Sequence, residues 1–211
     1  MEERNIAVTL NKAREWFNSG NATLKKIALQ AFNKDELVYN FKNITTFKEA
    51  CEALGLDYDI LSINAKGIAK ISKASAAMLK LNIIRKALNF GQDLHLTENL
   101  KNSHIYYPYN PFMPKSSTYY AQELKLGKVK VIGNIKNEGE VYCVLGGFSS
   151  YSSYGGLGNF LPGSKIGTAN GSSAFLGCAS DEIARHFGRY FGMLITEAKY
   201  GDLPNFEIMR K

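Results

Sequence analysis

A forty-residue stretch near the C-terminal end, residues 141–180, limits what this chain can fold into. It holds nine of the nineteen glycines but only one charged residue, Lys165. Glycine at this density excludes a long helix, because each glycine in a helix interior costs about 1 kcal/mol relative to alanine. A structureless loop of this length is also uncommon inside a compact domain. We therefore expect short strands and tight turns, with the tyrosines either packed beneath them or displayed above them.

A β-hairpin is predicted at the start of this stretch. Residues 128–132 alternate polar and apolar side chains, and residues 141–145 are β-branched and aromatic, which are both strand patterns. The segment 137–139 between them is typical of a hairpin turn in which Gly139 adopts a positive φ angle. Residues 172–176 predict one more strand.

The clearest element of the chain is a helix that begins after Ser180. Ser180 is a favourable N-cap, and the carboxylates of Asp181 and Glu182 interact well with the positive end of a helix dipole. Gly201 and Pro204 end the helix, and we expect the residues after them to form a short tail. Its apolar residues recur at helical spacing and predict a buried stripe: Ile183, Phe187, Phe191, Leu194, Ile195 and Ala198.

A line of small residues runs along the same helix at four-residue spacing: Ala184, Gly188 and Gly192. Each of the two glycines lowers the stability of the helix by about 1 kcal/mol relative to alanine. We therefore expect another backbone to pack very close to the helix along this line.

Helical patterns fill the chain up to about residue 100. Capping residues and terminal glycines predict helices over 10–18, from 21 or 23 to 32, over 46–54 and over 72–89, with a short helical turn at 33–36. Thr46 and Glu49 match a capping box, whereas the segment after Asp57 is ambiguous. Between residues 104 and 120, three prolines exclude a helix and confine any strand to a sheet edge.

Together these elements predict an α+β fold. A helical N-terminal half is followed by a small antiparallel sheet with a Gly/Tyr-rich loop region and a long C-terminal helix. We expect residues 1–211 to form a single compact unit, because no obvious flexible linker interrupts it. The alternative is a division into a helical part, 1–100, and an α+β part, 101–211.

Charge and composition bear on the setting of the protein. The chain carries a net charge of +7, which suits a polyanionic partner but equally serves solubility. No apolar run approaches the roughly 18 residues of a membrane span, so no membrane partner is expected. The first residues lack a signal-peptide core, which predicts a cytoplasmic site of synthesis. Three cysteines lie far apart in apolar contexts and are interpreted as small buried hydrophobes: Cys51, Cys143 and Cys178.

Four lysines are candidate phosphate contacts. On a helix with about 100° per residue they fall within an arc of roughly 80°; they are Lys66, Lys70, Lys73 and Lys80. Leu81, Ile84 and Leu88 fall on or beside the same arc one turn later, so the basic stripe cannot follow the full length of the helix. A solvated polar face is the alternative interpretation of these lysines.

Five tyrosines in non-helical segments are candidate base-stacking residues: Tyr106, Tyr107, Tyr109, Tyr151 and Tyr154. Aromatic side chains stack on successive bases in proteins that bind single-stranded nucleic acid. The alternative is that these rings pack across the helical half of the chain while their hydroxyls find hydrogen-bond partners.

The patterns of enzyme chemistry are incomplete in this chain. Residues 158–165 have the glycine spacing of a P-loop, but the final Lys-Ser pair is inverted and no helix follows directly. Glu182 and His186 lie four residues apart on a helix, but two residues do not form a metal site. Neither Cys143 nor Cys178 is tied to a histidine by a motif. We therefore favour a non-enzymatic role and expect no cofactor.

Several segments resemble a group of uncharacterised proteins from Bacteroidota and their tailed phages. Residues 44–55, ITTFKEACEALG, are similar to that group's ITTFEDACEALG segment, and residues 79–89 resemble its next helix. Residues 106–108 resemble its YYP segment, and residues 176–191 its closing strand, cap and helix. The resemblance implies a phage or prophage setting, hence the host cytoplasm or the virion. It implies no activity, because that group has no established function.

Three functions are compatible with these patterns. The first is a non-enzymatic phage accessory protein that binds nucleic acid, in particular single-stranded, through the lysines and tyrosines above. The second is a virion structural or assembly protein whose uncharged Gly/Ser/Tyr surface contacts other copies or other phage proteins. The third is a protein that binds or sequesters a small ligand such as a nucleotide, with backbone amides around its phosphate. Its ligand-binding residues would be Gly155, Gly156, Gly158 and Lys165.

Overall fold

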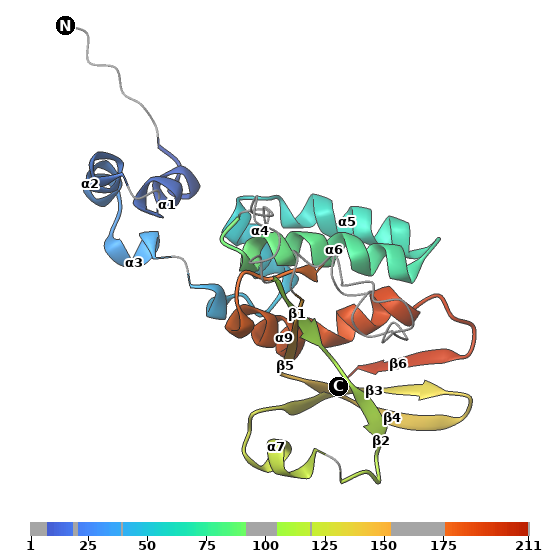
Figure 1. The fold of residues 1–211 in the computed structure, drawn as a ribbon. Helices are drawn as coiled ribbons and strands as arrows, with labels where there is room; N and C mark the ends of the chain where they lie inside the picture. The colour runs from blue at the N-terminus through green and yellow to red at the C-terminus, as the bar shows by residue number, and fades with distance from the viewer. Residues whose placement is uncertain are drawn as a thin grey trace, which may run out of the picture.

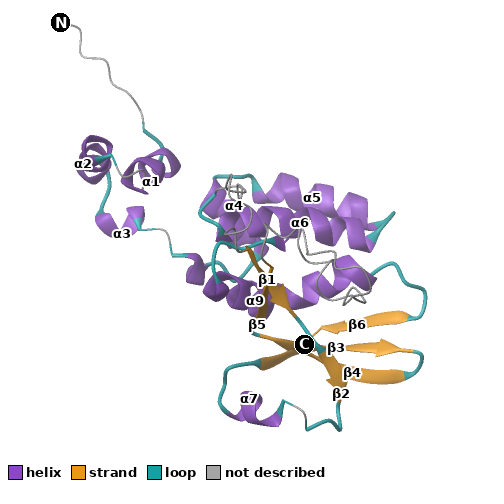
Figure 2. Cartoon of the chain, viewed as in Figure 1, coloured by secondary structure: helices purple, strands orange, loops and turns teal. Residues whose placement is uncertain are grey.

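The computed structural model describes residues 8–18, 21–38, 40–91, 105–118, 120–152 and 176–210. It confirms the predicted α+β fold, with a helical N-terminal part, small antiparallel sheets and a long C-terminal helix (Figures 1 and 2). The helices are α1 (Leu10–Asn18), α2 (Ala22–Ala31), α3 (Lys34–Leu37), a 3-10 turn (Phe41–Asn43), α4 (Phe47–Leu54), α5 (Tyr58–Ala69), α6 (Lys73–Leu88), α7 (Ala121–Lys125) and α9 (Asp181–Tyr200). The strands are β1 (Ile105–Tyr109), β2 (Phe112–Pro114), β3 (Lys130–Asn137), β4 (Glu140–Gly146), β5 (Phe148–Ser152) and β6 (Phe206–Arg210).

The strands form two antiparallel sheets. One sheet has four strands in the order β2-β4-β3-β6, and the other pairs β1 with β5. The predicted hairpin is confirmed as β3–β4, with Asn137 opposite Glu140. Both turn residues have positive φ angles, 50° at Glu138 and 88° at Gly139, which matches the turns that favour tight hairpins. Of the strand predicted over 172–176, residues 172–175 lie outside the described residues.

Helix α9 occupies the centre of the molecule, between the helical layer of α4–α6 and the strands (Figure 1). On the helical side, Phe187, Phe191 and Ile195 of α9 pack with Leu81 and Leu88 of α6 in the main hydrophobic core. This core draws on both the N-terminal helices and the C-terminal part of the chain. The predicted apolar stripe of α9 is therefore confirmed as the contact between the two parts.

The small residues of α9 line its other side, against the strands. A Cβ atom added to Gly188 would lie 3.3 Å from Pro108 Cβ and 3.4 Å from the carbonyl oxygen of Phe148. A Cβ atom added to Gly192 would lie 2.5 Å from Asn110 Nδ2. The predicted close approach of another backbone is confirmed at Gly188, by the carbonyl oxygen of Phe148 at the start of β5. At Gly192 the close atoms belong instead to the side chains of Asn110 and Ile132.

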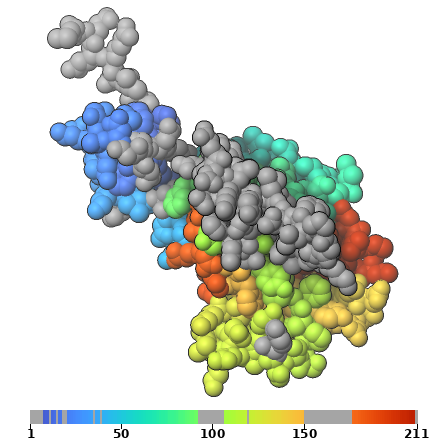
Figure 3. All heavy atoms as spheres, viewed as in Figure 1, coloured from blue at the N-terminus to red at the C-terminus, as the bar shows by residue number. Residues whose placement is uncertain are grey.

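Helices α1–α3 pack around a small core of their own, with Ala13, Ala28 and Leu37 at its centre. In the space-filling view they form a small lobe beside the larger body (Figure 3). Asn21 caps α2 by accepting hydrogen bonds from the amides of Thr23 and Leu24, as its position in the sequence predicted.

Candidate functional site

The predicted basic stripe divides between two helices. Lys66 lies in the last turn of α5 and Lys70 is its C-cap, whereas Lys73 is the first residue of α6. The prediction of one continuous helical arc is wrong, because the chain turns at residues 70–72 and Ser72 caps a new helix. Lys66, Lys70 and Lys73 are nevertheless exposed and lie at the same corner between α5 and α6. Lys80 lies further along α6, with its Nζ 5.9 Å from the centre of the Phe47 ring.

A carboxylate already occupies the positive end of α6. Asp202 Oδ1 accepts hydrogen bonds from the backbone amides of Lys73 (2.7 Å) and Ala74 (3.2 Å), and Oδ2 accepts one from the Ser72 hydroxyl (2.5 Å). The Ser72 hydrogen bond contributes most to lowering the pKa of Asp202. A phosphate group could not use these amides without displacing Asp202. Only the exposed lysine side chains of this corner could contact an anion.

The candidate stacking tyrosines have different environments. Tyr107 is 1 % exposed, so neither face of its ring is open to a base, and we leave it out of any interface. Tyr106 is partly buried against the main core. Tyr109 is partly exposed and its ring meets Phe148 edge-on at 6.3 Å. The backbone of Tyr151 pairs with Tyr106 across β1 and β5, but its side chain lies outside the described residues.

Five other predicted site residues also lie outside the described residues: Tyr154, Gly155, Gly156, Gly158 and Lys165. The third function in particular depends on this segment, so its ligand-binding loop stays a prediction.

A cleft that the sequence did not reveal lies between α9 and the start of β3. It has a volume of about 270 Å³ and is lined by Lys130, Val131, Ile132, Arg189, Tyr190 and Met193. Lys130 Nζ lies 4.7 Å from the centre of the Tyr190 ring, which is within cation–π range. Tyr190 is 44 % exposed, whereas the aromatic residues nearby on α9, Phe187 and Phe191, are buried. The described lining thus combines an exposed aromatic ring with two cations and contains no carboxylate.

The backbone brings these side chains together because α9 lies very close to β3. A Cβ atom added to Gly133 would lie 2.4 Å from Met193 Sδ, so the Met193 side chain packs directly on this strand position and a side chain there would displace it. Arg189 Nη2 donates hydrogen bonds to the carbonyl oxygens of Lys128 (2.8 Å) and Gly127 (3.3 Å). These bonds hold the turn that precedes β3 against α9 and so place Lys130 over Tyr190.

His186 lies next to the Tyr190 ring. The two ring centres are 4.6 Å apart, and His186 Nε2 lies 2.8 Å from the carbonyl oxygen of Ile44. Burial lowers the pKa of His186 and favours the neutral ring. Glu182, four residues earlier, forms an ion pair with Lys42 at 2.7 Å. Among the described residues, no group of three or more His, Cys, Asp or Glu side chains is placed to hold a metal ion.

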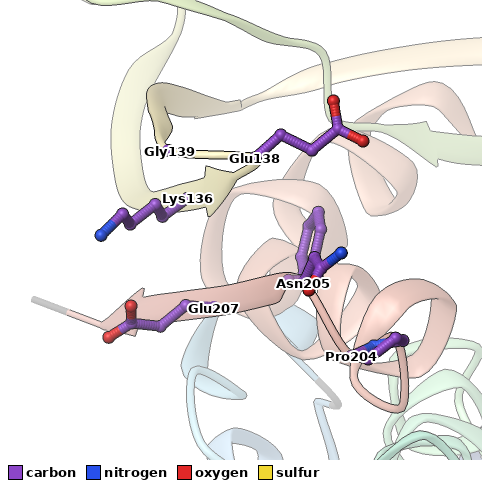
Figure 4. Close-up of a pocket in the computed structure, with 7 residues that line it drawn as sticks. Lys136, Glu138, Gly139, Pro204, Asn205 and Glu207 are labelled. Atoms are coloured by element: carbon purple, nitrogen blue, oxygen red, sulfur yellow. The ribbon is translucent and has the colours of Figure 1, made fainter.

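A second cavity, of about 300 Å³, lies where the β3–β4 turn meets the start of β6. Lys136 and Glu207 face each other across β3 and β6, and their side chains extend to the same side, while Glu138 points away from them (Figure 4). A cross-strand pair of opposite charges is a common stabilising feature of sheets. The charged groups do not converge on one point, so we do not treat this cavity as a functional site.

The two most buried cysteines are poor nucleophiles. Burial raises the pKa of the Cys178 thiol, and burial also raises that of Cys51, which disfavours the reactive thiolate. Cys178 Sγ lies 3.4 Å from the carbonyl oxygen of Leu176, inside the main core. Both residues therefore pack as the small hydrophobes that the sequence predicted.

Comparisons with known proteins add no relative: no protein-family model, no curated protein and no solved structure matches this chain. The resemblance to uncharacterised Bacteroidota and phage proteins therefore stays a prediction. Among the described residues, no helix is long and apolar enough to cross a membrane.

Proposed function

We propose that this protein binds single-stranded nucleic acid, without catalysing a reaction on it, in the cleft between α9 and β3. One observation carries the proposal. Lys130 Nζ lies over the half-exposed ring of Tyr190, and Arg189 lines the same cleft. An aromatic platform flanked by cations is the recurring arrangement of surfaces that bind single strands.

The binding step follows from the geometry. His186 lies next to the Tyr190 ring and Lys130 lies over it, so a base that stacks on the face covered by Lys130 must displace that side chain. Lys130 has a long, flexible side chain, and a base that displaced it from the ring would bring a phosphate within its reach. Arg189 stays bound to the carbonyl oxygens of residues 127 and 128 and contributes positive charge without moving.

The charge of the whole chain supports the same partner. A net charge of +7 attracts a polyanion over distances of about 10 Å at 0.1 M salt. The exposed lysines at the α5–α6 corner would add to this attraction. The phage or prophage setting of the proposal rests on the sequence resemblance. Assembly through the uncharged Gly/Ser/Tyr segment depends largely on residues 153–175, outside the described residues, and stays an alternative prediction.

Fluorescence anisotropy with labelled single-stranded and duplex oligonucleotides tests the proposal. We expect single strands to bind more tightly, with an affinity that falls steeply between about 50 and 200 mM salt. Tyr190→Ala should weaken binding by about 5- to 150-fold, since one stacked base contributes about 1–3 kcal/mol. Lys130→Gln should reduce the salt dependence by about one phosphate contact.

A matched control is present in the small lobe. Lys25 Nζ lies 4.9 Å from the centre of the Phe17 ring, so Lys25→Gln removes the same charge and the same kind of contact far from the cleft along the chain. This variant should bind as the unmodified protein does, apart from a small uniform loss. Absence of binding at low salt, or equal binding by folded Tyr190→Ala, would refute the proposal. Circular dichroism confirms that each variant is folded.

A further inference from the structure

Helix α5 carries an apolar stripe on its solvent side. Ile60 is 58 % exposed and Ile63 is 67 % exposed, and Gly67 is exposed between them and the end of the helix. At about 100° per residue these three residues fall within roughly 60° of the helix circumference. Ile71, in the turn that follows, is 92 % exposed. α5 is the outermost helix on the side away from the sheets, and its other face packs on α6 and α4 (Figure 1).

Gly67 has no packing role within the described structure. A Cβ atom added to it would meet nothing within 4 Å, whereas one added to Gly192 would overlap Asn110 and Ile132. Glycine destabilises a helix interior relative to alanine. The fold therefore explains the glycines of α9 but leaves Gly67 unexplained, and Gly67 lies within the exposed stripe, between Ile63 and Ile71.

Charged residues border one edge of the stripe. Asp59, Lys66 and Lys70 fall within about 40° of one another on the helix circumference, next to Ile63. All three are exposed, and none of them forms an ion pair with another residue in the described part of the chain. Asp59 lies at the start of the helix, whereas Lys66 and Lys70 lie at its end. The edge is therefore negatively charged at one end and positively charged at the other.

We propose that this face of α5 is a self-association surface, on which α5 of a second copy of the chain packs antiparallel about a two-fold axis. In such a pair, a residue of one copy lies opposite a residue of the other copy when the sum of their two residue numbers is about 130. Ile63 then lies over Gly67 of the second copy, where the missing side chain leaves room. Asp59 lies beside Lys70 of the second copy, and two-fold symmetry repeats each contact.

The pattern of charges selects this occupant. An acidic helix would be attracted by Lys66 and Lys70 but repelled by Asp59, and an anionic lipid surface would be affected in the same way. A second copy in antiparallel orientation places opposite charges together at both ends of the edge. The stripe is thus complementary to itself, both in shape at Ile63 and Gly67 and in charge at Asp59 and Lys70.

The contact is small, which sets the conditions of the experiment. A helix of 12 residues is about 18 Å long, so the interface lies at the low end of specific interface sizes. We expect a reversible dimer of the full-length chain, measurable by sedimentation velocity between about 1 μM and 1 mM.

Three variants test the apolar contact. Ile63→Glu should abolish the dimer, because it places charge in the centre of the stripe. Gly67→Leu should also abolish it by filling the space for Ile63, while leaving the folded monomer intact because leucine favours helix. Ile27→Glu is the matched control: Ile27 is 40 % exposed on α2 and its substitution should leave the dimer unchanged.

Charge exchange tests the antiparallel register. Asp59→Lys or Lys70→Asp alone should weaken the dimer by about 3- to 10-fold, since each places like charges together twice. The double variant should restore most of the affinity. A chain that stays monomeric up to about 1 mM overturns the proposal. Unchanged dimerisation of the Ile63→Glu variant also overturns it, because that dimer would form through another surface. Loss of oligonucleotide binding on Lys70→Asp without any dimer would assign this face to nucleic acid instead.

Discussion

Replacement of Gly192 by alanine examines how closely α9 is held against the strands. The new Cβ atom would lie 2.3 Å from Ile132 Cδ1, 2.5 Å from Asn110 Nδ2 and 2.9 Å from Asn110 Cγ. Ile132 can move aside at its flexible end, but Asn110 cannot move freely. Its Nδ2 donates hydrogen bonds to the carbonyl oxygens of Leu145 (3.0 Å) and Gly188 (2.9 Å).

The magnitude follows from three contributions. Overpacking a close contact costs about 1–3 kcal/mol, and each hydrogen bond of Asn110 that breaks costs about 1 kcal/mol. Alanine in place of glycine returns about 1 kcal/mol of helix stability. We therefore expect Gly192→Ala to lower the free energy of unfolding by about 2–3 kcal/mol, measured by urea denaturation followed by circular dichroism.

Gly188→Ala is the internal comparison. Its Cβ atom would approach no described atom closer than 3.3 Å, so a small shift relieves the contact and the gain in helix propensity offsets it. We expect its free energy of unfolding to stay within about 1 kcal/mol of the unmodified protein. If Gly192→Ala were equally stable, or if Gly188→Ala were the more damaging, the packing of α9 described above would be wrong.

Three further predictions concern stability. Asn89→Ala should lower the free energy of unfolding by about 3 kcal/mol, because buried Asn89 makes three hydrogen bonds. One goes to the carbonyl oxygen of Arg85 within α6, and two join α6 to Gly177 and Ala179 before α9. A change below about 1 kcal/mol would contradict this prediction. His186 has a lowered pKa in the folded protein, so the unfolded chain binds the proton more readily, and stability should decline as the pH falls below about 6.5. His186→Gln should flatten that decline in urea titrations. The pKa of Glu49 is lowered chiefly by the hydrogen bond from the backbone amide of Thr45. Its stabilising effect should therefore be lost as the pH falls below the ordinary glutamate pKa of about 4.3. Glu49→Gln should remove this pH dependence, at a cost of about 1 kcal/mol at neutral pH.

Local interactions explain why several elements were predicted correctly. Ser180 Oγ accepts a hydrogen bond from the amide of Ile183, and Thr46 with Glu49 forms the capping box that the sequence indicated. The turn at residues 138–139 likewise depends on the two residues that form it. Caps and tight turns satisfy their backbone groups within three or four residues, so their signal is complete in a short segment.

Two elements needed tertiary contacts to be recognised. The segment Phe206–Arg210 was expected to be a tail, but it forms β6 because β3, about 70 residues earlier, supplies its hydrogen-bond partners. α5 was ambiguous because its isoleucines suit strands as well as helices. Asp57 caps it, and packing against α6 completes it. Its end at residue 70 also divided the predicted basic stripe.

The sequence alone determined that α9 would have a capped start, an apolar stripe and a line of small residues that requires a close neighbour. Which segments would supply that neighbour was decided only by the tertiary structure, because Pro108 and Asn110 lie about 80 residues away along the chain. The same holds for the candidate site, where Lys130 of β3 meets Tyr190 of α9. A helix cap depends only on residues that are neighbours in the sequence. A cleft exists only after distant segments pack together, and a local sequence pattern does not predict which segments those will be.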